Sequence, residues 1–85
     1  MGLVLGLTCG ESLSIGSLKV TLLRIITPQR YVVEAQGTEY TVSSESWTFL
    51  SPGCQVRSTL PRHGNPLIGR VRIQINAPLL PVVRH

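Results

Sequence analysis

Apolar and polar residues alternate along most of this chain, and the alternation is clearest over residues 71–78, which read VRIQINAP. Val71, Ile73 and Ile75 alternate there with polar residues, a period of two that places the apolar set on one face of a β-strand. Pro78 ends this strand, because proline lacks an N–H and restricts the residue before it. The long polar face predicts a half-exposed strand in an antiparallel sheet.

The same pattern predicts further strands, which Gly and Pro separate. The clearest hairpin joins residues 30–35 to residues 38–43, because Gly37 between them can take the positive φ of a tight turn. Residues 47–50 fit either one capped helical turn or another strand. Pro81 places the last strand at a sheet edge or makes it begin after that residue. Strands are predicted over residues 3–7, 11–16, 19–26, 30–35, 38–43, 54–60, 67–76 and 79–85.

No long stretch of the chain has helical periodicity, so the predicted fold class is all-β. The 85 residues suffice for one domain, and we expect a small antiparallel β-barrel or sandwich over residues 1–85. A monomer of this size has a thin core, and an intertwined homodimer would enlarge it.

The charge balance favours an anionic partner. The chain has eight Lys and Arg against four Glu, a net charge of +4, and all but one of the cations are Arg. Arginine forms bidentate contacts with phosphates and bases, although solvated strand faces that prevent aggregation are an equally simple interpretation. Tyr31, Tyr40 and Trp47 could stack on bases, but core positions are favoured for them. The arginines on predicted strands or adjoining loops are Arg24, Arg30, Arg57, Arg62, Arg70 and Arg72.

Catalysis is poorly supported, and we expect neither an enzyme nor a cofactor. The chain has no Asp, and His63 and His85 lie outside any metal-ligand pattern. Cys9 and Cys54 lack CxxC spacing and are expected to be reduced thiols. The apolar run over residues 1–7 is too short for a signal peptide or a membrane span, so a cytoplasmic protein without membrane contact is expected.

Two segments together resemble the carbon storage regulator (CsrA/RsmA) family of bacterial translational regulators. Residues 7–16, LTCGESLSIG, are similar to the family's opening pattern of Leu-Thr followed by Gly-Glu-x-Leu-x-Ile-Gly. Residues 71–78 are similar to its Val-Arg-Ile-x-Ile/Val-Asn-Ala-Pro, and Val82-Val83-Arg84 to its last strand.

The resemblance implies an intertwined homodimeric β-barrel, in which the last strand of one protomer lies beside the first strand of the other. It also implies binding of GGA-containing loops of mRNA or small RNA, which alters translation or RNA stability. Single-stranded loops suit recognition through backbone groups, arginine and base edges. The predicted RNA-binding residues are Leu5, Leu7, Thr8, Arg62, Arg72, Arg84 and His85.

The chain departs from this family pattern in several places. The family's RNA-contacting Arg of the last strand aligns with His85 when counted without gaps from Pro78, and with Arg84 if one residue is skipped. Cys9 and Gly10 stand where the family has two Arg, and residues 27–70 replace a short turn. We interpret that segment as a hairpin-containing insertion. In the alternative alignment, residues 20–50 follow the family's strand spacing and the C-terminal third is a partial repeat, which gives a fused, pseudo-dimeric barrel. The departures also leave open a protein-interaction module that has lost RNA binding and forms mixed dimers with a related regulator or sequesters it.

Overall fold

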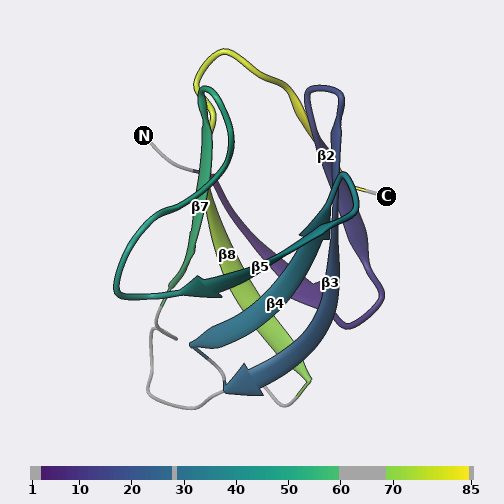
Figure 1. The fold of residues 1–85 in the computed structure, drawn as a ribbon, viewed down its shortest axis with the longest axis vertical. Coiled ribbons are helices and arrows are strands. Elements are labelled where there is room, and N and C mark those ends of the chain that lie inside the picture. The colour runs from purple at the N-terminus through teal and green to yellow at the C-terminus, as the bar shows by residue number, and fades with distance from the viewer. Residues whose placement is uncertain (1–2, 28, 60–68, 85) are drawn as a thin grey trace.

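The computed structural model describes residues 3–27, 29–59 and 69–84, and within these residues it contains nine β-strands and no helix (Figure 1). The all-β prediction is therefore confirmed. The strands are β1 (Leu3–Thr8), β2 (Ser12–Ile15), β3 (Leu18–Thr27), β4 (Arg30–Ala35), β5 (Thr38–Ser43), β6 (Thr48–Ser51), β7 (Cys54–Ser58), β8 (Arg70–Asn76) and β9 (Val82–Arg84).

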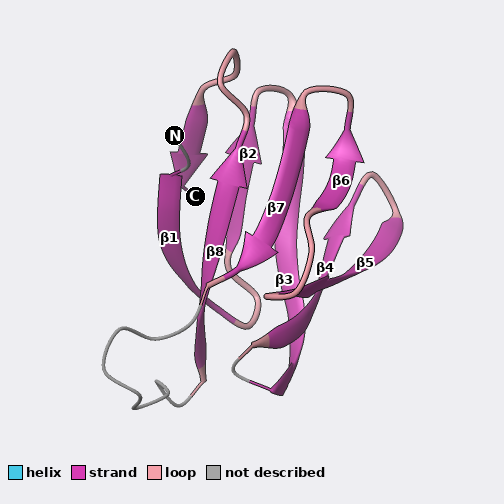
Figure 2. Ribbon diagram, turned by 90° about the vertical axis from the view of Figure 1, so that its left-hand side faces the viewer, coloured by secondary structure: helices cyan, strands magenta, loops and turns pink. Residues whose placement is uncertain are grey.

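The strands form two antiparallel sheets that pack face to face as an open sandwich rather than closing into a barrel (Figure 2). The four-stranded sheet has the order β1-β8-β7-β6, and the five-stranded sheet has the order β5-β4-β3-β2-β9. Each sheet is thus a run of consecutive antiparallel strands, completed by one strand from the opposite end of the chain. β1 pairs with β8, whereas β9 pairs with β2.

This pairing of the terminal strands takes place within one chain. The resemblance predicts first and last strands that meet across a dimer, but here β1 and β9 find their partners in the same polypeptide. The described part of residues 27–70 supplies β4 to β7, which lie in both sheets. The segment that the first alignment treats as an insertion is therefore part of the sandwich.

Most predicted strands lie where the alternation placed them. The β4–β5 hairpin has the predicted bounds, and its turn has φ of 54° at Gln36 and 78° at Gly37. Two positive φ values in a two-residue loop match the right-handed twist of the flanking strands. The alternatives for residues 47–50 resolve to a strand, β6, and β9 begins after Pro81.

The core lies between the sheets and contains the apolar half of each alternating pattern. Leu7 of β1 faces Val71 of β8, and both are buried, as are Leu13 and Ile15 of β2. Fully burying an aliphatic side chain contributes about 1.5–3 kcal/mol, which makes this two-sided core the main source of stability. Tyr31 of β4 is also fully buried, which confirms the core position favoured for it.

Candidate nucleic-acid interface

Arginines gather where β1 and β8 pair, on the outer face of the four-stranded sheet. The register places Gly6 opposite Arg72 and Thr8 opposite Arg70. Their neighbours along each strand face the core, so the period of two directs both arginines outward, and both are exposed. Arg70 and Arg72 therefore form a basic surface beside the first strand.

Gly6 makes room for these side chains. A Cβ atom at this position would lie 3.3 Å from Cδ of Arg70, so only glycine lets that arginine lie across β1 without displacement. Together with Val4 and Leu5, the residues Gly6, Arg70 and Arg72 line a surface hollow of about 350 Å³. The hollow is open to solvent and has two guanidinium groups at its rim.

The last strand adds a third arginine from the other sheet. Arg84 of β9 reaches across the open side of the sandwich, where its Nη2 donates a hydrogen bond to the backbone carbonyl of Gly6. The first and last strands thus meet at Gly6. We call Arg70, Arg72 and Arg84, grouped around Gly6, the Gly6 arginine cluster.

Glu11 lies beside this cluster in the turn from β1 to β2. The backbone N–H of Thr8 donates to its Oε1 at 2.7 Å, and the backbone N–H of Leu22 donates to its carbonyl at 3.0 Å. The hydrogen bond from Thr8 lowers the pKa of Glu11, and the positive charges of Arg84 and Arg70 lower it further. The carboxylate is therefore ionised at neutral pH and partly offsets the positive field of the cluster.

Two arginines outside the cluster are paired with acids. Among the described residues, salt bridges join Arg24 to Glu39 at 3.2 Å and Arg30 to Glu45 at 3.9 Å. The arginines of the Gly6 cluster take part in neither. Arg70 and Arg72 are consequently available to an external anion, whereas Nη2 of Arg84 already donates to the Gly6 carbonyl.

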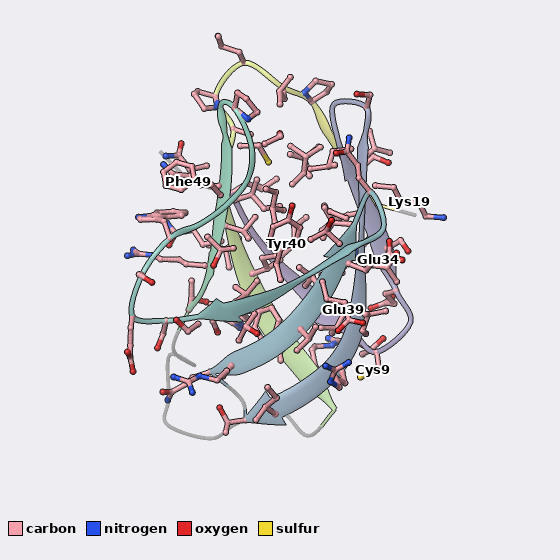
Figure 3. All side chains as sticks on the ribbon, viewed as in Figure 1. Cys9, Lys19, Glu34, Glu39, Tyr40 and Phe49 are labelled. Carbon is pink, nitrogen blue, oxygen red and sulfur yellow. The ribbon has the colours of Figure 1, made fainter. Side chains whose placement is uncertain are left out.

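Two of the four glutamates, Glu34 and Glu39, lie away from the four-stranded sheet. Glu34 and Glu39 belong to β4 and β5 of the five-stranded sheet, and Figure 3 shows them on the opposite side of the molecule from Phe49 of β6. The strands β1, β6, β7 and β8, within their described bounds, contain no Asp or Glu. The strands of the four-stranded sheet therefore carry only positive charges, whereas those of the five-stranded sheet carry charges of both signs.

The structure brings together part of the predicted RNA site. Leu5, Thr8, Arg72 and Arg84 lie at or beside the cluster. Leu7 does not, because it is fully buried in the core. Arg62 and His85 fall outside the described residues.

The predicted site omits Gly6 and Arg70. The spacing of Arg70, two residues before Arg72, signals a shared face in a strand. Nothing in the sequence singles out Gly6, because its role depends on which strand pairs with β1.

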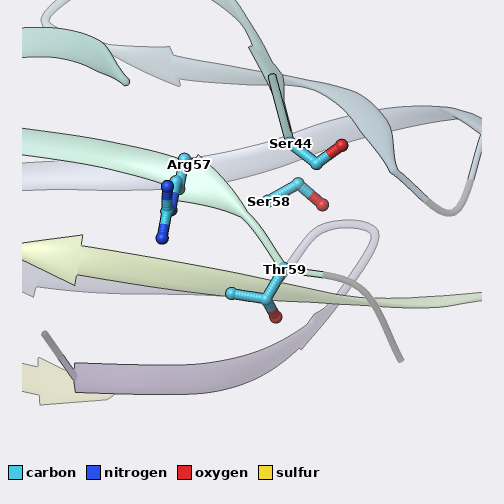
Figure 4. A pocket seen from close by; sticks show the side chains of 4 residues that line it. All are labelled: Ser44, Arg57, Ser58 and Thr59. Carbon is cyan, nitrogen blue, oxygen red and sulfur yellow. The ribbon is translucent and has the colours of Figure 1, made fainter. Parts of the chain in front are cut away.

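A second hollow, of about 270 Å³, is lined by Ser44, Arg57, Ser58 and Thr59 (Figure 4). The hydroxyls of Ser44 and Ser58 point away from the Arg57 guanidinium. These polar groups do not converge on one point, so the hollow lacks the arrangement of a ligand site.

Across residues 3–27, 29–59 and 69–84, no three His, Cys, Asp or Glu side chains gather as metal ligands, and no helix could cross a membrane. Cys9 is exposed and Cys54 is buried, and both are free thiols, as expected.

Comparisons of this chain with protein-family models, with curated proteins and with solved structures gave no match.

Proposed function

We propose that this protein binds single-stranded RNA through the Gly6 arginine cluster and regulates translation or RNA stability. The observation that carries the proposal is the convergence of Arg70, Arg72 and Arg84 on Gly6, where the first and last strands meet. Three guanidinium groups outside the salt bridges of the described residues suit phosphate oxygens and base edges.

The surroundings of the cluster favour a single strand over a duplex. β1 is an edge strand, so its backbone groups along one side lie outside the sheet ladder and are suited to the edges of splayed bases. Gly6 lets the Arg70 side chain lie directly over this stretch of β1. The similarity of residues 7–16 and 71–78 to the carbon storage regulator motifs adds support, because these segments meet at the cluster, and it makes GGA-containing loops the first RNA to test.

We further propose that one chain suffices for the site, as in the fused, pseudo-dimeric alternative. The placement of the terminal strands supports this. Within one polypeptide, β1 joins the sheet built from β6 to β8, and β9 joins the sheet built from β2 to β5. Light scattering after size-exclusion chromatography tests it. A particle of 9.3 kDa that binds RNA is expected, whereas a dimer that dissociates together with loss of RNA binding would contradict the single-chain site.

The RNA-binding proposal is tested by fluorescence anisotropy with a hairpin RNA that presents GGA in its loop. The single substitutions Arg70→Ala, Arg72→Ala and Arg84→Ala should each weaken binding and lower the slope of log K against log salt by about 1. Arg24→Ala and Arg30→Ala, which remove arginines that are paired with Glu39 and Glu45, serve as matched controls. A triple cluster variant that binds as tightly as the controls would refute the proposal.

One observation favours the second candidate, a protein-interaction module. The terminal strands expose Leu3, Val4 and Val83 along sheet edges, and such edges can pair with a strand of another chain. A related regulator would then be bound by edge pairing in a mixed dimer. This candidate predicts that Val83→Lys abolishes association with the regulator while Arg72→Ala does not.

A further inference from the structure

We propose that the RNA path continues from the Gly6 arginine cluster across the outer face of the four-stranded sheet to a base-stacking platform. This platform consists of Trp47, Phe49 and Arg57. The inference rests on the proposed function and adds the part of the site that would hold the bases.

Trp47 and Arg57 form a stacked pair. The guanidinium carbon of Arg57 lies 4.6 Å from the centroid of the Trp47 ring, within the range of a cation–π contact. Nε of Arg57 also donates a 2.8 Å hydrogen bond to Oε1 of Gln74. Because the Trp47 ring and the Gln74 side chain both hold the guanidinium, Arg57 presents a fixed planar surface next to an aromatic ring.

Phe49 extends the platform. Its exposed fraction is 69%, and the register places it opposite Gln55, which in turn faces Asn76. Figure 3 shows Phe49 projecting away from the body of the sandwich. An exposed phenylalanine on a strand contributes little to the core, but its ring face is free to stack on a base.

The register connects this platform to the cluster. Arg72 and Gln74 are two residues apart on β8 and share its outer face, with Gly6 opposite the first and Arg57 opposite the second. With neighbouring strands about 4.8 Å apart, the face from β1 to β6 spans roughly 14 Å. Phosphate-binding groups lie at one end of this face and stacking groups at the other, a spacing that a few linked nucleotides can cover.

The chemistry of this face favours a nucleic acid over a protein partner. Its four strands carry no acid within their described bounds. Between the cluster and the platform lie the amides Gln55, Gln74 and Asn76, which can donate to and accept from base edges. Aromatic rings combined with arginine and amides are typical of sequence-tolerant single-strand binding.

Trp47 is the only tryptophan of the chain, so its fluorescence reports on stacking directly. The probe is a single-stranded RNA, titrated in parallel with an abasic ribose-phosphate strand of equal length. Quenching by the RNA without quenching by the abasic strand is expected. An equal response to both strands, or none to either, would overturn the stacking platform.

Phe49→Ala provides an independent test. Stacking contributes about 1–3 kcal/mol per base, so this change should weaken RNA binding roughly five- to 150-fold. Ile26→Ala, which removes an apolar side chain that is 56% exposed on the other sheet, is the matched control. Thermal melts should match the wild type for both variants, since neither residue lies in the core.

The outcomes separate the two proposals. If the cluster variants lose RNA while Phe49→Ala behaves like Ile26→Ala, the platform is refuted and the proposed function stands. If the wild-type protein binds no RNA, both are refuted. If Trp47 fluorescence changes with protein concentration in the absence of RNA, and RNA adds nothing, the face is a protein interface instead.

Discussion

The hydroxyl of Tyr31 in β4 donates a 3.0 Å hydrogen bond to the backbone carbonyl of Arg72 in β8. Tyr31 is fully buried, so this bond crosses the core and joins the two sheets. The same carbonyl accepts the N–H of Thr59 at 3.2 Å. The segment of β8 that directs Arg72 outward is thus held from the inside of the sandwich.

Tyr31→Phe should lower the free energy of unfolding by about 1 kcal/mol, the typical net contribution of one hydrogen bond. The cost stays moderate because the carbonyl of Arg72 keeps Thr59 as a donor. Urea unfolding followed by circular dichroism measures the change. An unaltered midpoint would mean that the bond contributes nothing to joining the sheets.

Stability should also fall at high pH in a manner that depends on Tyr31. Burial raises the pKa of Tyr31 above its ordinary value of about 10. Above that pH the unfolded chain loses the phenolic proton while the folded chain keeps it, so the unfolded state gains stability as pH rises. Urea midpoints measured from neutral pH upward should therefore decline more steeply for the wild type than for Tyr31→Phe. Parallel curves would contradict this assignment.

Gly6→Val should separate RNA binding from stability. Position 6 lies in a strand, where valine is favoured, so the thermal midpoint should be unchanged or higher. The added side chain displaces Arg70, and we expect about a tenfold loss of RNA affinity, equivalent to the roughly 1.5 kcal/mol of one charged hydrogen bond. Gly6→Ala should fall between valine and the wild type. Equal RNA affinities for the wild type, Gly6→Ala and Gly6→Val would argue against contact between RNA and this part of β1.

Glu11→Gln should strengthen RNA binding. Gln keeps an acceptor for the Thr8 N–H but removes the negative charge beside Arg84 and Arg70. The gain should be measurable at low salt and should disappear at high salt as the charges are screened. Glu34→Gln on the other sheet is the control. Equal gains for both variants would indicate an effect of net charge alone.

The two cysteines should differ in reactivity. Burial raises the pKa of the Cys54 thiol and shields it, whereas Cys9 is exposed. Iodoacetamide should modify Cys9 in the native protein and Cys54 only after denaturation, as mass spectrometry of the peptides would reveal. Similar rates at both sites in the native state would mean that the β7 side of the core opens readily.

Much of the local structure could be predicted from the sequence because strand periodicity is a property of neighbouring residues. The alternation over residues 71–78 identifies β8 and the side chains that it buries. The same alternation places Leu7 in the core and Thr8 on the opposite face of β1, although the family resemblance groups both as RNA contacts. Gly37 likewise favours the β4–β5 turn, because glycine takes a positive φ without a steric penalty.

The candidate site required the tertiary structure, because its members lie far apart in the chain. Whether Arg72 has glycine or a bulky residue opposite depends on the pairing of β1 with β8, which no local pattern encodes. The contact of Arg84 with Gly6 depends on β9 joining the other sheet. Hydrophobicity assigns Trp47 to the core, yet the residue is only partly buried and its ring stacks on Arg57. By itself, then, the sequence determined the strands and most of their buried faces, since these follow from backbone geometry and water exclusion. Tertiary structure alone decided which outer faces lie side by side, since strand order is set by long-range packing of the whole core.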